Sequence, residues 1–293
     1  MANVLMPELL FRRIAQAVPR DLHKNLLLVG SIAAAYAFRN QLQQRGVNTK
    51  DADVVITPAG AVDESREIAT QLLNAGWRRH DKCYPAKHQS CELQAIRLLP
   101  PAGSDFFLEF LTLPPAGQRD AKAWIAVQLP DGWYGLPSFR FMGLAGVQPV
   151  TSEHGIRYAR PSMMALANLL SHPEVGGQTM SEPIGGRTLL RSAKDLGRVL
   201  ALAWLAGPEA VEAWPSEWRH ALEQVLPHEA DDLARTASRG LEALIADANA
   251  FEQAHHAVTV GLLAGMGVSE AQLLATARRM LADAVVPLAR TVL

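Results

Sequence analysis

Apolar residues recur with two different periods along the chain, and the change of period divides it into two parts. Up to about residue 160, short apolar runs typical of buried strands alternate with segments of helical spacing. Beyond Pro161, apolar residues recur only at helical spacing, in segments at 162–171, 188–206, 216–225, 229–251 and 269–292. We therefore expect a mixed α/β domain at residues 1–160 and an all-α helical domain at residues 161–293.

The first part is expected to build a mixed sheet from apolar strands separated by helices. Its main predicted helices span residues 7–17, 31–44 and 63–75, and its main predicted strands span residues 26–29, 51–56 and 105–113. Ser31 is placed to cap the second of these helices. In the helical part, Ser269 and Gln272 have the spacing of a capping box at the start of the last segment.

Two aspartates begin the predicted strand at 51–56. Side chains alternate between the faces of a strand, so Asp51 and Asp53 share one face and Ala52 points to the other. Two carboxylates a few ångströms apart repel each other unless a cation lies between them. Mg²⁺ is commonly held by one or two carboxylates together with substrate phosphates, so the pair predicts a Mg²⁺ site.

A Gly30-Ser31 turn follows the apolar run at 26–29 and precedes a predicted helix. Backbone N–H groups at such a turn can bind a phosphate. Turns of this kind are common before helices, and this one gains meaning from the aspartate pair on the next predicted strand. Together the two features indicate a site for a metal and a nucleotide.

Glu109 lies in an otherwise apolar predicted strand. A lone carboxylate in such a place is costly unless it is paired or bound to a metal. If this strand lies beside residues 51–56, Glu109 joins Asp51 and Asp53 as a third metal ligand. The alternative is that Glu109 is the structural partner of an arginine such as Arg97.

These residues resemble the pattern of the nucleotidyltransferase superfamily with the DNA polymerase β-like core. That pattern is an apolar strand, Gly-Gly or Gly-Ser, a helix, Asp-x-Asp on the next strand and a third acidic residue on a later strand. The positions that match it here are Gly30, Ser31, Asp51, Asp53 and Glu109.

The resemblance extends to the branch that contains the abortive-infection and type IV toxin–antitoxin nucleotidyltransferases. In that branch a Thr or Ser precedes the acidic pair, as Thr49 does here. A helical domain then carries a basic-Lys-Asp motif, which residues 191–195 of this chain resemble, with Arg191, Lys194 and Asp195 at the matching positions. The resemblance covers roughly residues 25–115 and 160–205.

The resemblance implies a role for each matching residue. Asp51, Asp53 and Glu109 would hold Mg²⁺, with two ions expected, and Glu109 could instead act as a base. Gly30, Ser31 and Thr49 would bind the nucleoside triphosphate, the substrate. Arg191 and Lys194 would bind its phosphates, and Asp195 would orient Lys194 or assist the acceptor hydroxyl. Arg191, Lys194, Asp195 and Arg198 fall on one stripe of a predicted helix. The alternative interpretation of this stripe is a solvated helix face whose charges pair with one another.

Charge and cysteine content narrow the choice of partners and compartment. The formal net charge is −1, from 28 Lys and Arg against 29 Asp and Glu, so no overall field attracts nucleic acid or a membrane surface. Only two cysteines occur, Cys83 and Cys91, which fits a reducing cytoplasm. The N-terminal residues show no signal-peptide pattern, and no apolar window approaches the ~20 residues of a membrane span.

The sequence therefore favours a two-domain, Mg²⁺-dependent nucleotidyltransferase that moves a nucleoside monophosphate from an NTP to an acceptor hydroxyl and releases pyrophosphate. The acceptor could be a tRNA 3′ end, a protein or a small molecule, and the resemblance allows an antitoxin protein as partner. The alternative is a catalytically silent fold of the same kind that binds a nucleotide or a protein. Asn168 and Arg198 motivate it, because the branch commonly has a lysine near the first position and an acid at the second.

Overall fold

The computed structural model describes residues 4–49, 51–80, 83–88, 91–101, 106–175 and 177–290. The chain divides into two compact units, one formed by Met1–Arg39 and Gln44–Ala159 and the other by Asn40–Gln43 and Arg160–Leu293. The chain is mixed α/β and 52% helical, with a mixed sheet in the first unit and a helical C-terminal region. The side chains of Cys83 and Cys91 lie outside the described residues.

The first unit contains all the strands of the described chain. Its helices are α1 (Pro7–Ala17), the 3₁₀ segment η1 (Arg20–Asn25), α2 (Gly30–Ala37), α3 (Val62–Asn74) and α4 (Met142–Ala145). Its strands are β1 (Val4–Leu5), β2 (Leu26–Leu28), β3 (Val47–Asn48), β4 (Asp51–Ile56), β5 (Arg78–Arg79), β6 (Cys83–His88), β7 (Cys91–Ala95), β8 (Arg97–Leu99), β9 (Phe107–Thr112), β10 (Lys122–Leu129), β11 (Gly132–Phe139), β12 (Val150–Thr151) and β13 (Arg157–Tyr158).

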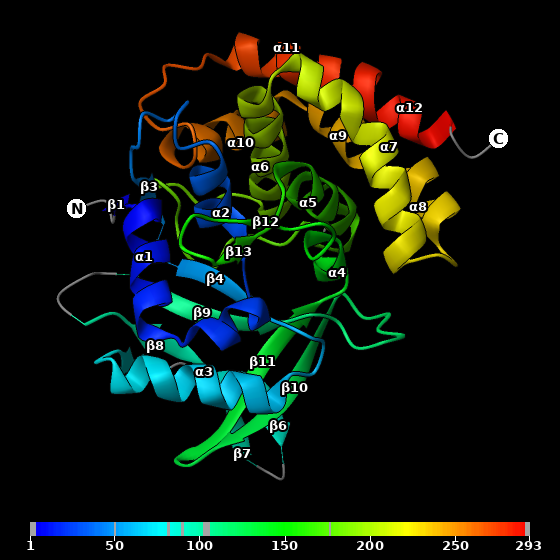
Figure 1. Cartoon of the computed structure of the whole chain (residues 1–293). Coiled ribbons are helices and arrows are strands. Elements are labelled where there is room, and N and C mark those ends of the chain that lie inside the picture. Colours follow the sequence, from blue (N-terminus) through cyan, green and yellow to red (C-terminus); the bar gives the residue numbers. More distant parts are fainter. Residues whose placement is uncertain are drawn as a thin grey trace. The chain divides into compact units, whose positions relative to one another are not determined.

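Most of these strands form one mixed sheet, with β1 and β3 paired separately. The main order is β12-β13-β2-β4-β9-β11-β7-β6, and β8 also pairs with β9 while β10 pairs with β11. Strand β4 runs antiparallel to β2 and parallel to β9, and the three lie in the middle of the sheet (Figure 1). The apolar side chains of these strands are buried, and α2 packs against β4.

The second unit is built from helices. They are α5 (Pro161–Val175), α6 (Arg191–Ala206), α7 (Pro208–Val225), α8 (Ala230–Thr236), α9 (Ser238–Ala246), α10 (Ala248–Val260), α11 (Glu270–Met280), the π-helical segment η2 (Leu281–Val285) and α12 (Val286–Arg290). Helix α6 packs against both α5 and α10. The Trp218 side chain of α7 is fully buried, and its Nε1 donates to the Ser162 carbonyl on α5 at 2.8 Å.

Several sequence predictions are confirmed in detail. Helix α1 and strand β4 have the bounds expected for them, and the capping box of Ser269 and Gln272 is formed at α11. Helices α3 and α5 and strand β9 also occur where they are expected, within a few residues.

Other predictions about the elements are wrong. The helix expected at 31–44 ends at Ala37, where Phe38 leaves the helical conformation, and the chain continues in turns up to Gln43 and Gln44, whose φ angles are positive. Ser31 does not cap it, since Gly30 is already helical and Val29 is the N-cap residue. The single helix expected at 229–251 is divided into α8, α9 and part of α10, and the Asp247 side chain caps α10.

Among the described residues, every helix is too short or too polar to cross a membrane.

Candidate functional site

The two acidic positions of β4 and the one of β9 are brought together by strand pairing. Strands β4 and β9 are parallel, with Asp51 opposite Phe107 and Asp53 opposite Glu109. Paired residues lie on the same face, and so do residues two apart along one strand. The carboxylate oxygens of Asp51, Asp53 and Glu109 accordingly offer ligand atoms within 4.8 Å of one another. We call these three residues the acidic cluster.

The acidic cluster runs from the surface into the sheet. Asp51 is exposed, Asp53 is intermediate and Glu109 is 8% exposed. Ala52 and Val54, on the other face of β4, are fully buried, as the alternation of the strand requires. The cluster is therefore most accessible to solvent at its Asp51 end.

Glu109 is also half of an ion pair. Arg97 of β8 lies directly opposite it in the antiparallel β8–β9 pair, and Arg97 Nη2 donates to both Glu109 oxygens, at 3.0 and 2.9 Å. The guanidinium lies over the Phe107 ring, 4.3 Å from its centroid. Both interpretations of Glu109 made from the sequence thus have geometric support: it lies in the acidic cluster and it is the partner of Arg97.

The β2–α2 turn touches the cluster through its backbone. Gly30 has a φ of +70°, and a Cβ at this position would lie 2.9 Å from Asp53 Oδ2. The Val29 N–H donates to the Asp53 carbonyl at 3.1 Å. Only glycine combines the positive φ with this close approach, so the Gly-Ser turn is shaped around Asp53, with Ser31 in the first turn of α2.

Thr49 supports the outer end of the cluster. Its hydroxyl donates to Asp51 Oδ1 at 2.9 Å and lies 3.1 Å from the Asp51 carbonyl. The residue was expected to contact the nucleotide. Its observed contact is with a proposed metal ligand, which it helps to orient.

The remaining predicted site residues belong to the second unit. Arg191, Lys194 and Asp195 lie in the first two turns of α6, and all three are of intermediate burial. That this stripe contributes to the same site as the acidic cluster stays a prediction.

The sequence did not reveal that His172 lies within reach of the Asp195 charge. Burial lowers the pKa of His172 on α5, and the negative charge of Asp195 opposes that effect. The Nδ1 atom of His172 is buried without a hydrogen-bond partner in the described part of the chain. The only signal in the sequence is that both residues lie on neighbouring predicted helices, which does not by itself predict that the Asp195 charge acts on His172.

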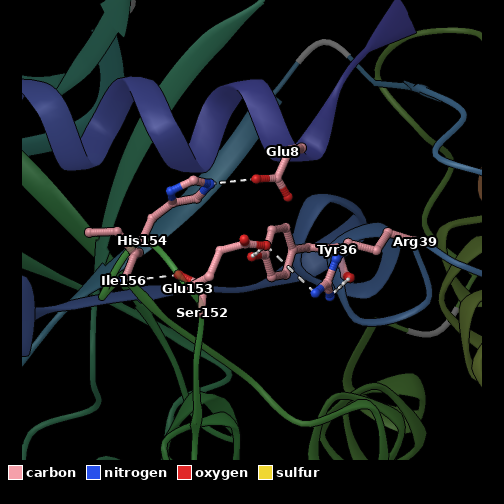
Figure 2. Close-up of polar contacts among 7 residues, drawn as sticks. All are labelled: Glu8, Tyr36, Arg39, Ser152, Glu153, His154 and Ile156. Carbon is pink, nitrogen blue, oxygen red and sulfur yellow. Dashed lines mark hydrogen bonds and ion pairs between the residues drawn. The ribbon is translucent and has the colours of Figure 1, made fainter.

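A second group of potential metal ligands was also missed. Glu8 of α1 and Glu153 and His154 of the β12–β13 turn offer ligand atoms within 4.8 Å of one another. Figure 2 shows how they are used: His154 contacts Glu8, while Glu153 accepts from the Tyr36 hydroxyl at 3.4 Å and lies 3.8 Å from Arg39. The group links α1 and α2 to the turn, and its members lie too far apart in sequence for a motif to reveal them.

The polar side chains of this second group are engaged in contacts with protein groups. Its two carboxylates contact the Arg39 guanidinium and the His154 imidazole, so both acids have partners within the protein. Burial, with Glu8 and Glu153 nearby, raises the pKa of Tyr36 to about 12. We therefore assign it a structural role.

Comparison with known proteins gives no assignment: no family model, no curated protein and no solved structure matches this chain. The case for a function therefore depends on the geometry of the acidic cluster and on its surroundings.

The close approach of Gly30 to Asp53 can be tested by substitution. Gly30→Ala and Gly60→Ala both place a side chain at a φ near +70°, but a Cβ at Gly60 meets nothing within 4 Å. We expect about 1–2 kcal/mol of lost unfolding free energy from the backbone conformation in both variants, and a larger loss in Gly30→Ala because Asp53 must move. Chemical denaturation measures both. Equal losses would show that Gly30 and Asp53 are not in contact.

The second group predicts a dependence of stability on alkaline pH. The pKa of Tyr36 is about 12 in the folded chain against 10.0 ordinarily, so its contribution is complete below pH 10 and is lost as the pH rises to 12. Tyr36→Phe should therefore show a shallower decline of unfolding free energy between pH 10 and 12 than the wild-type protein. The measurement is urea denaturation at several pH values, and identical slopes would contradict the assignment.

Proposed function

We propose that this chain is a Mg²⁺-dependent nucleotidyltransferase that transfers a nucleoside monophosphate from an NTP to an acceptor hydroxyl. The observation that carries the proposal is the acidic cluster, in which two carboxylates of β4 and one of β9 converge beside a glycine turn at the start of a helix. The likeness of this arrangement to the nucleotidyltransferase pattern supports the same proposed function.

The donor set of the cluster fits a hard divalent cation. All three residues offer carboxylate oxygens, which are the ligands that Mg²⁺ prefers. Gly30 leaves open the space next to Asp53 that a Cβ would fill. Asp51 and Asp53 would hold Mg²⁺, and bound Mg²⁺ would neutralise the triphosphate and stabilise the leaving pyrophosphate.

The chain's own groups would supply the rest of the reaction. Backbone N–H groups in the first turn of α2, at Gly30 and Ser31, would bind the substrate phosphates, as the N-termini of helices can. Thr49 keeps Asp51 oriented. Glu109 is the candidate to accept the proton of the attacking hydroxyl, which requires that it be released from Arg97. Lys194 would neutralise substrate phosphates, and Asp195 would orient the lysine or the acceptor.

One observation favours a second candidate function. Both oxygens of Glu109 accept from Arg97, so the third carboxylate of the cluster is already engaged. A chain that keeps this pair closed would bind a nucleotide through Asp51, Asp53 and the α2 turn without transferring it. This is the catalytically silent binding module that the sequence left as an alternative.

The proposed reaction requires both aspartates of β4. In the presence of Mg²⁺, labelled NTPs and cell extract, Asp51→Asn and Asp53→Asn should each lower label transfer and pyrophosphate release by ~100-fold or more, because each removes a charged metal ligand. Asp63→Asn is the matched control: Asp63 is an exposed acid on α3 that pairs with Arg66. It should retain full transfer.

The two candidate functions separate in the same assay. Transfer that survives Asp53→Asn would contradict the proposed mechanism. Binding of an NTP with no transfer for any of the four nucleotides would favour the binding module.

A further inference from the structure

Two acidic side chains and one basic side chain lie in one row across the sheet. Asp53 of β4 is opposite Glu109 of β9, and Glu109 is opposite Arg97 of β8. The register thus places a guanidinium on the far side of the same carboxylate that belongs to the acidic cluster. Any cation at the cluster and the Arg97 side chain would both be attracted to Glu109.

Arg97 is enclosed to the same degree as its partner. The side chains of Arg97 and Glu109 are each 10% exposed, and their closest N–O distance is 2.9 Å. A single nitrogen, Nη2, contacts both carboxylate oxygens. Nε is buried and has no hydrogen-bond partner in the described part of the chain. The pair is therefore not the two-nitrogen fork in which arginine binds carboxylates most firmly.

We propose that Arg97 is a positioning residue that competes with a divalent cation for Glu109 and so limits cation binding at the acidic cluster. Asp51 and Asp53 bind the first cation, and Glu109 becomes a ligand only where Arg97 releases it. This inference rests on the proposed function for the identity of the cluster, but it concerns cation binding and needs no turnover.

The physical basis is repulsion between like charges that use the same acceptor. A carboxylate has about four lone-pair sites, so its oxygens can in geometry serve both an arginine and a metal. A guanidinium 2.9 Å from those oxygens nevertheless repels a second positive charge placed there. The low exposure of the pair leaves little water to screen that repulsion.

A merely structural role for Arg97 makes the opposite prediction. On that view the guanidinium only balances a carboxylate buried in the sheet. Its removal would lower stability, because a buried charge is left unpaired, and would bring no gain in cation affinity.

The test is Mn²⁺ binding to the full chain, measured by electron paramagnetic resonance of the free ion. Arg97→Gln should bind Mn²⁺ at least tenfold more tightly than the wild-type protein or gain a second site. Arg97→Lys, which keeps the charge, should stay within threefold of wild type. The double variant Arg97→Gln/Glu109→Gln should lose the gain, because Glu109 provides it.

Arg79→Gln is the matched control. Arg79 also pairs with a carboxylate, Asp131, at 2.7 Å, and also lies over an aromatic ring, that of Tyr134 at 4.5 Å. It belongs to the same unit but not to the row through Asp53. Its Mn²⁺ affinity should equal that of wild type.

Unchanged or weaker Mn²⁺ binding by folded Arg97→Gln, as judged by circular dichroism, would overturn the proposal. If this variant does not fold, the double variant Arg97→Gln/Glu109→Gln, which removes both charges of the pair together, decides the matter. Competition predicts that its Mn²⁺ affinity stays within threefold of wild type, whereas a tenfold loss would show that Glu109 is a ligand despite Arg97 and would overturn the proposal. A gain of Mn²⁺ binding without label transfer would reject only the proposed function, and transfer without that gain would reject only this inference.

Discussion

The arrangement of the candidate site depends on the register of one strand pair. Strands β4 and β9 run parallel, with Asp53 opposite Glu109. Because the side-chain period of a strand is two, a slip of one residue would send Glu109 to the opposite face and leave the two aspartates without it. The register is fixed by burial, since the apolar residues that alternate with Asp51 and Asp53 on β4 are fully buried. The position of three carboxylates is thus a consequence of how the apolar side chains pack.

The same packing buries the charged Glu109 side chain, and a neighbouring strand supplies its partner. Glu109 lies where water is scarce, and a carboxylate in such a place needs a partner. Arg97 meets this need from the next strand, and its guanidinium lies over the Phe107 ring. The innermost member of the acidic cluster is thus held by an ion pair within the sheet, whereas the exposed outermost member, Asp51, accepts a hydrogen bond from Thr49. Freedom to bind a ligand therefore increases towards the surface.

Local patterns in the sequence predict those parts of the fold that local physics determines. The alternation of Asp51, Ala52 and Asp53 was sufficient for strand β4, and the Ser269–Gln272 spacing was sufficient for the start of α11. Strand β11 was not recognised, because its glycines and Pro137 are typical of turns. The structure explains Gly135 differently: a Cβ there would lie 3.2 Å from side-chain atoms of Leu93 and Trp124, so the close packing of neighbouring strands favours a glycine. Such requirements come from tertiary contacts, as do the link from Glu8 to His154 and the charge of Asp195 near His172.

The two candidate functions differ in the state of a single ion pair, and this has a consequence for how the site should be understood. Asp51, Asp53 and the Gly30 turn meet without Arg97: the Val29 N–H donates to the Asp53 carbonyl, and Gly30 approaches Asp53 closely. In the proposed function, these residues would hold the cation and the phosphate. Transfer requires more, namely a carboxylate free to accept a proton, and Glu109 is the member of the cluster that Arg97 occupies. Under the proposed function, binding and chemistry would therefore separate at Arg97, and the strength of its contact with Glu109 would decide between the two candidate functions.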